Sequence, residues 1–154
     1  MAIVRILVDG YSLLHVWRDL APNEQRHSAQ AREALIRVLT QYVDSAGTPV
    51  TLFFDGTGGP KDAPKNISSD SLEIIFSRDS KTADDLIERT AYRLKPYGEA
   101  LAVTNDYAER DTVISMGGLA QSCEDFIKDI EHTLNERDDF LKLYNRREAN
   151  RYKR

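Results

Sequence analysis

Four short apolar runs alternate with longer amphipathic stretches, and this alternation limits the folds open to the chain. The runs are continuous rather than alternating in polarity, and they are rich in Ile, Val, Leu and Phe, which is typical of strands covered on both faces by helices. They cover residues 3–8, 49–54, 72–76 and 100–103, and residues 119–121 could add a brief fifth strand. The pattern predicts an α/β fold, with a mainly parallel sheet of four to five strands and helices on both faces.

The amphipathic stretches carry the start signals of helices. Thr82 with Asp85, and Ser122 with Asp125, each form a capping-box pattern at a helix N-terminus. Residues 56–71 contain several Gly and Pro and are predicted to form one long loop. Helices are predicted over residues 31–46, 82–95, 107–115 and 123–144.

Composition excludes several classes of protein and of metal site. No stretch approaches the roughly 18 consecutive apolar residues of a membrane span, and the first apolar run meets Asp9 instead of a small-residue cleavage site. A soluble, cytoplasmic protein without membrane contact is therefore expected. The single cysteine, Cys123, excludes an intramolecular disulfide and a thiolate-rich metal site. Because the three histidines are widely spaced, the metal chemistry that remains is that of Mg²⁺, Mn²⁺ or Ca²⁺ on carboxylates.

Charge is distributed unevenly along the chain. Residues 146–154 hold five basic side chains and one Glu, so this segment carries +4 of a net charge of −4 and leaves −8 on the remainder. We therefore divide the chain into a domain of residues 1–145 and a basic C-terminal tail of residues 146–154. Such a tail is a candidate contact for a polyanion.

Acidic residues follow three of the four main strands. Asp9 follows the first, Asp55 the second and Asp106 the fourth. Each has a structural alternative, because Asp55 with Gly56 is a turn signal and Asp106 is a candidate helix N-cap. Their coincidence at one sheet edge needs a further reason, since crowded carboxylates repel and raise each other's pKa unless a cation shares them. A divalent metal site is the hypothesis that this pattern favours.

Helical geometry selects one acid within the sequence TADDLIE. At about 100° per residue, Asp84 lies beside the apolar stripe of its helix, whereas Asp85 points nearly opposite to it. Asp84 is therefore expected to face the strand ends, and Asp85 to serve the helix start. Glu88 lies one turn beyond Asp84 on the same flank.

An acidic site of this kind suits one class of reaction. Carboxylates that hold Mg²⁺ or Mn²⁺ allow the ion to acidify a bound water and to neutralise charge on a phosphate, which is the chemistry of metal-assisted phosphodiester hydrolysis. Basic residues must then guide a polyanionic substrate toward the acids. The candidates for this role are Arg78, Lys81, Arg110 and the basic tail.

Four motifs in order carry a resemblance to a known family. The segments ILVDGYSLL, TLFFDG, IIFSRDSKTADDLIE and AVTNDYAERDTVISMGG closely resemble the YacP-like branch of the NYN-domain proteins, which are PIN-like ribonucleases, over residues 3–130. The resemblance implies a Rossmann-like (PIN-like) three-layer sandwich. It also implies a metal-dependent endoribonuclease site that uses Mg²⁺ or Mn²⁺.

The resemblance also implies roles for single acids. The family's catalytic and metal-binding aspartates fall on Asp9, Asp84 and Asp106. Glu88 matches the acid that follows the TAD segment by one turn, and Asp55 matches the position after the second strand, where it would be a further metal ligand. The resulting catalytic set is Asp9, Asp84, Asp106 and Glu88, and the resulting metal set is Asp9, Asp84, Asp106 and Asp55.

Two polar residues of the motifs are expected to contact the substrate. The family usually has Asn where Ser12 stands, and a serine hydroxyl can donate to a phosphate or a metal-bound water, or cap the following helix. Asn105, within the TND segment, is the other expected contact. Both would join Arg78, Lys81 and Arg110 in binding RNA.

Three functions remain open from the sequence. The first is an endoribonuclease that cuts single-stranded or locally unpaired RNA, such as mRNA, with the ribosome as a candidate partner. The second is an RNA-binding or ribosome-docking module of the same fold without turnover. The third is a phosphatase with an aspartyl nucleophile, which is disfavoured because such enzymes need a second acid two residues after Asp9, where Tyr11 stands.

Overall fold

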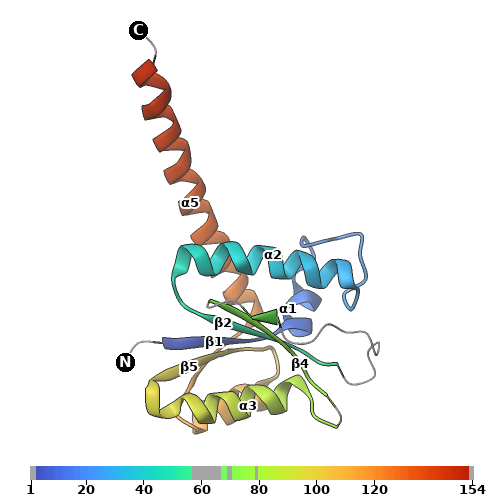
Figure 1. The fold of residues 1–154 in the computed structure, drawn as a ribbon. Coiled ribbons are helices and arrows are strands. Elements are labelled where there is room, and N and C mark those ends of the chain that lie inside the picture. Colours follow the sequence, from blue (N-terminus) through green and yellow to red (C-terminus); the bar gives the residue numbers. More distant parts are fainter. Residues whose placement is uncertain (1–2, 57–66, 69–70, 79, 153–154) are drawn as a thin grey trace.

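A computed structural model describes residues 3–56, 67–68, 71–78 and 80–152 of the chain, and its centre is one six-stranded sheet (Figure 1). The strand order is β3-β4-β2-β1-β5-β6, with β3 antiparallel to β4 and every other neighbouring pair parallel. The strands are β1 (Ile3–Asp9), β2 (Val50–Phe54), β3 (Ile67–Ser68), β4 (Leu72–Phe76), β5 (Glu99–Val103) and β6 (Leu119–Gln121). The predicted mainly parallel sheet is confirmed, including the brief last strand.

The predicted loop of residues 56–71 is interrupted by the edge strand β3. Ile67 pairs with Ile74 of β4, so that part of the prediction was wrong. A strand of two residues is too short to show a periodicity of its own, and it forms because β4 offers an unpaired edge. Residues 57–66 and 69–70 of the predicted loop lie outside the described residues.

Helices cover both faces of the sheet and give the expected three layers (Figure 1). The helices are α1 (Gly10–Val16), α2 (Ala29–Ala46), α3 (Ala83–Leu94), α4 (Tyr107–Ser115) and α5 (Cys123–Tyr152), and the 3-10 turn η1 (Lys95–Tyr97) follows α3. The core on one face of the sheet includes Leu13, Leu35 and Phe126 of α1, α2 and α5, and the core on the other face includes Ile87 and Val113 of α3 and α4. None of these described helices is apolar enough over its length to cross a membrane.

The predicted helix signals act at the expected places, with one exception at the C-terminus. Ser122 accepts a hydrogen bond from the backbone N–H of Asp125 at 3.1 Å, which caps the start of α5. That helix continues to Tyr152, beyond the predicted end at Tyr144, because no Gly or Pro interrupts its last turns. Residues 146–152 of the basic tail are thus helical backbone, and Figure 1 shows this end of α5 extending away from the sheet.

The chain reverses its direction of travel across the sheet beside β1. It moves from β1 to β2 and β4 on one side, and then returns through α3 to β5 on the other side of β1. In open α/β sheets, ligands bind outside the carboxyl ends of the strands at such a switch point. Asp9, the last residue of β1, and Asp106, just after β5, both lie there.

Gly10 fixes how closely α1 approaches the sheet. A Cβ added to this buried glycine would lie 2.4 Å from Cε1 of Phe54 and 3.0 Å from the carbonyl oxygen of Phe53. No side chain fits in that space unless the backbone of β2 or the ring of Phe54 moves. The glycine that follows Asp9 is therefore required by packing.

Gly10→Ala should destabilise the chain by about 1–3 kcal/mol, because it overpacks the contact with Phe54. Denaturant unfolding measures this loss. The Gly10→Ala/Phe54→Leu double variant should lose less than the sum of the two single variants, since the smaller side chain makes room for the new methyl group. Additive losses, or an unchanged midpoint for Gly10→Ala, would contradict the packing argument.

Candidate active site

Asp9 is held at the end of β1 by the first turn of α1. It is the N-cap of that helix, where the backbone N–H of Ser12 lies 3.4 Å from its Oδ1. The Ser12 hydroxyl donates to Oδ2 at 2.9 Å, so this serine orients the aspartate. Burial raises the pKa of Asp9 above its ordinary value of 3.8, the two bonds from Ser12 oppose that rise, and the charge of Asp55 adds to it.

Asp84 and Asp85, adjacent in the first turn of α3, have different surroundings. Asp85 forms the capping box, in which its Oδ2 accepts from the N–H of Thr82 at 3.0 Å while its own N–H donates to Oγ1 of Thr82 at 3.2 Å. Asp84 instead forms a hydrogen bond with the carboxyl group of Asp9. The predicted orientations of the two aspartates are confirmed.

Asp84 is the most strongly perturbed of the predicted acids. Burial, followed by the charges of Asp9, Asp106 and Glu88, raises the pKa of Asp84 from 3.8 to about 6. Three of the predicted acids thus contribute to the raised pKa of Asp84. The sheet edge therefore concentrates negative charge around this side chain.

Glu109 is an acid of this cluster that sequence reasoning missed. Its side chain is only 4% exposed, and its Oε1 is buried with no hydrogen-bond partner. Burial, a hydrogen bond with Glu88 and the charges of Asp84, Glu88 and Asp106 raise the pKa of Glu109 to about 9. Three residues after the N-cap Asp106, it has the spacing of an ordinary capping acid, which hides its inward orientation from the sequence.

Asp106 and Asn105 both stabilise helix starts. Oδ1 of Asp106 accepts from the N–H of Ala108 at 2.9 Å and caps α4, as its structural alternative predicted, while its charge still reaches Asp84. Asn105 connects β5 to α5, since its Oδ1 accepts from the N–H of Cys123 at 2.8 Å and its Nδ2 donates to Glu124 at 2.6 Å. Both the oxygen and the nitrogen of the Asn105 amide therefore already have a hydrogen-bond partner within the protein.

The remaining predicted residues have different surroundings. Asp55 lies at the pocket over Asp9, and its Oδ1 accepts from the Ser77 hydroxyl at 3.2 Å. Arg110 extends over the ring of Tyr107, 4.5 Å from the centroid. Arg78, which is exposed, Lys81 and Arg110 are absent from the residues that line the described pockets.

Two small pockets meet over the acids. One of about 270 Å³ is lined by Asp9, Tyr11, Ser12, His27, Asp55, Thr82, Ala83 and Asp84. The other, of about 280 Å³, is lined by Tyr11, Ser12, His15, Val16, His27 and Asn105. Because Tyr11, Ser12 and His27 belong to both, the two pockets form one continuous depression, which we take as the candidate active site.

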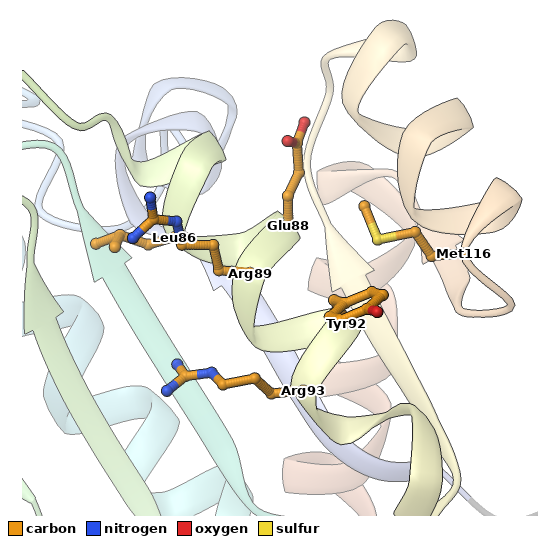
Figure 2. Close-up of a pocket in the computed structure, with 6 residues that line it drawn as sticks. All are labelled: Leu86, Glu88, Arg89, Tyr92, Arg93 and Met116. Atoms are coloured by element: carbon orange, nitrogen blue, oxygen red, sulfur yellow. The ribbon is translucent and has the colours of Figure 1, made fainter.

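A larger groove of about 530 Å³ follows the outer side of α3. Figure 2 shows Glu88 and Tyr92 on the side of the helix toward Met116, with Arg89 and Arg93 on the opposite side. Of the acids described above, Glu88 alone lines it. The groove is therefore an extension beside the acidic cluster, whereas Asp9, Asp55 and Asp84 line one of the two smaller pockets.

The donor chemistry of the acidic cluster fits a hydrated hard cation. Among the described residues, no three His, Cys, Asp or Glu side chains are already grouped as ligands. However, Mg²⁺ usually keeps several waters and takes one or two protein carboxylates together with substrate phosphates. The hydrogen-bonded pair of Asp9 and Asp84 could supply those carboxylates, with Asp106 and Glu88 near enough to act on Asp84 by charge.

Comparison with known proteins agrees with this geometry. Residues 6–154 match the family described as the YacP-like NYN domain. The chain belongs to this family. The NYN domain is a PIN-like nuclease family.

Relatives of this NYN domain come from Bacillus subtilis. The uncharacterized protein YacP of strain 168 is 29% identical over 127 residues, which are 82% of this chain and 74% of the relative. A crystal structure of Rae1 (YacP) superposes with a TM-score of 0.78 at 24% identity, covering 97% of this chain and 84% of that one. A second, of a mutant, gives 0.77 at 24% identity over 92% and 82%. These structures confirm the fold.

Asp84→Asn should stabilise the metal-free chain by on the order of 1 kcal/mol at about pH 7.5, a value reduced from the pKa shift because the side chain is half-buried. The pKa of Asp84 is 3.8 when unfolded and about 6 when folded, so its ionisation costs stability fully above about pH 6 and not at all below pH 3.8. The gain should therefore disappear as the pH falls toward about 4. Denaturant unfolding in EDTA at the two pH values measures it.

Asp85→Ala is the matched comparison in the same helical turn. It should lose about 0.5–1 kcal/mol at neutral pH, because it removes one acceptor of the capping box. Opposite signs for the two variants support the assigned surroundings. A loss of stability for Asp84→Asn, or a gain that persists at about pH 4, would contradict them.

Proposed function

We propose that this NYN domain is a metal-dependent endoribonuclease that hydrolyses phosphodiester bonds of single-stranded RNA. The observation that carries the proposal is the hydrogen-bonded pair of Asp9 and Asp84 at the switch point of the sheet, with the pKa of both raised. A pair of buried carboxyl groups is costly unless a cation or proton shares it. The PIN-like nuclease fold of the family supports this reaction class.

Asp9 and Asp84 would hold Mg²⁺ or Mn²⁺, with Asp106, Glu88 and Asp55 as further acids around it. When bound, such an ion supplies an acidified water and neutralises negative charge on the phosphate. Ser12 orients Asp9 through two hydrogen bonds, so that the carboxylate presents a fixed face to the pocket. The capping box of Asp85 fixes the first turn of α3 and with it the position of Asp84.

Glu109 and Glu88 would form a proton-sharing pair behind the metal-binding carboxylates. The pKa of Glu109, raised to about 9, keeps its carboxyl group protonated at neutral pH and makes it the donor to Glu88. The neutral Glu109 carboxyl group then adds no negative charge near the substrate. This arrangement would lessen the repulsion of an approaching phosphate.

RNA would enter over the two joined pockets, where Ser12 and the wall that includes Asn105 are the polar contacts. Arg78, Lys81 and Arg110, together with the basic segment 146–154, would guide the polyanion. The body of the chain is acidic, so this guidance must come from local patches. An mRNA in the cytoplasm, presented on or off a ribosome, is the substrate class we propose.

Asp9→Asn and Asp84→Asn should each lower cleavage of an end-labelled single-stranded RNA in Mn²⁺ by about 10²-fold or more, because each removes a metal-binding carboxylate worth several kcal/mol in the transition state. EDTA should abolish cleavage by the unmodified chain. Asp85→Asn, from the same turn of α3, should stay within a few-fold of the unmodified chain, because the amide oxygen of Asn can still accept the capping hydrogen bond from Thr82.

Persistent cleavage by the Asp9→Asn/Asp84→Asn double variant would overturn the assignment. A folded, unmodified chain that binds RNA in EDTA but never cleaves it in Mn²⁺ would instead support the RNA-binding module. In that case, removal of residues 146–154 should weaken binding to all RNA sequences and flatten its dependence on salt.

A further inference from the structure

Four aromatic rings form a continuous ladder from the sheet to the candidate active site. Phe76 of β4 lies 5.3 Å from Phe54 of β2, Phe54 lies 5.0 Å from Tyr11 of α1, and Tyr11 lies 4.2 Å from His27, all between ring centroids. Phe54 is fully buried, whereas His27 is exposed. The ladder therefore passes from the partly buried Phe76 through the buried Phe54 to an imidazole at the surface.

Arg32 of α2 holds the outer rings of the ladder in place. Its Nη1 donates to the Tyr11 hydroxyl at 3.1 Å and to the backbone carbonyl of His27 at 2.8 Å. Its guanidinium also lies 5.9 Å from the centroid of the Phe76 ring. A single side chain thus links both ends of the aromatic ladder.

Arg26 orders the loop that carries His27. Its guanidinium donates to backbone carbonyl oxygens around the whole loop, at 3.1 Å to Leu14 and Trp17 and 2.9 Å to Leu20, and also to those of Ala21 and Glu24. A loop fixed in this way loses little further conformational entropy when a ligand binds. The position of the imidazole is therefore set before any ligand arrives.

His27 lies where the two pockets of the candidate site meet. It lines the pocket that contains Asp9 and Asp84, and it also lines the neighbouring pocket that ends at Asn105. A nucleotide is a phosphate joined to a flat aromatic base. A site for it needs a place for the phosphate, which a metal ion held by acids would provide, beside an aromatic surface for the base. The joined pockets offer both, in adjacent positions.

We propose that His27 is the stacking platform for the RNA nucleobase that adjoins the phosphate held over Asp9 and Asp84. The base adds a fifth ring to the ladder and occupies the pocket lined by Tyr11, Ser12 and Asn105. Any base has a π-face, so the contact selects unpaired RNA without selecting its sequence. This inference rests on the proposed function, because it places the base relative to the phosphate that is cut.

The test is a double-mutant cycle in which one change removes the ring of His27 and the other removes one base of the RNA. Binding of labelled RNA pentamers is measured by fluorescence anisotropy in EDTA, with the full chain carrying Asp84→Asn, which removes one repelling carboxylate. One pentamer is intact, and each of the others lacks the base at one position. Three further changes are made in this background: His27→Ala, His27→Phe, and His132→Ala as the control, an exposed histidine on α5 that pairs with Glu136.

His27→Ala should weaken binding of the intact pentamer by about 5- to 150-fold, the range measured for loss of one base–aromatic stack. His27→Phe should restore most of that affinity, and His132→Ala should stay within about two-fold. Removing the base at one position should weaken RNA binding by the Asp84→Asn chain by a similar factor. The same removal should not weaken RNA binding by the Asp84→Asn/His27→Ala chain any further. Equal affinity of His27→Ala and its parent, or additive losses at every position, would overturn the proposal.

A separate cleavage measurement in Mn²⁺ distinguishes this inference from the proposed function. If the otherwise unmodified chain cleaves RNA and binding is independent of His27, the platform is overturned and the endoribonuclease stands. If binding follows the ring and the base as described but no cleavage occurs, the platform stands as a base-binding site and hydrolysis is overturned.

Discussion

The structure depends on the contact between two carboxyl groups that repel each other when ionised. Asp9 ends the central strand β1 and Asp84 begins α3, and the two meet at the switch point of the sheet. Nothing in local helix or strand propensity favours this contact, and burial together with the charges of Asp9, Asp106 and Glu88 raises the pKa of Asp84. The surrounding fold must hold them together, which is the arrangement expected where a cation is to be bound.

Several unrelated interactions converge on holding that pair. Ser12 orients Asp9, the capping box of Thr82 and Asp85 sets the first turn of α3, and Gly10 lets α1 pack against Phe54. The same Phe54 continues outward as the aromatic ladder toward His27. Phe54 therefore packs beside Asp9 through Gly10 and also supports the rings that lead to His27. The acids and the proposed base-binding ring thus both depend on this residue of β2.

Sequence reasoning succeeded where a local pattern determines the structure. Continuous apolar runs located the parallel strands, and helical periodicity separated Asp84 from Asp85 because both face assignments follow from 100° per residue. It failed where distant residues decide. The edge strand β3 exists only through its partner β4, and the inward orientation of Glu109 and the double use of Asn105 depend on how α4 and α5 pack.

The proposed role of His27 shows the same limit more clearly. In the sequence it is an isolated histidine in a polar segment, and nothing nearby marks it as part of a site. Only the folded chain brings Tyr11, Phe54 and Phe76 into line behind it. The metal-binding and catalytic roles of the acids likewise stay predictions, because the fold establishes their proximity and charge but not their chemistry.

The central claim is that a divalent cation is shared by Asp9 and Asp84, and anomalous diffraction from Mn²⁺-soaked crystals of the full chain tests it most directly. The account predicts a peak about 2.0–2.2 Å from an oxygen of each carboxylate, with the hydrogen bond between the two groups replaced by metal coordination. If the Mn²⁺ peaks lie elsewhere while Asp9 and Asp84 stay hydrogen-bonded to each other, the pair is not a metal site and the account is wrong.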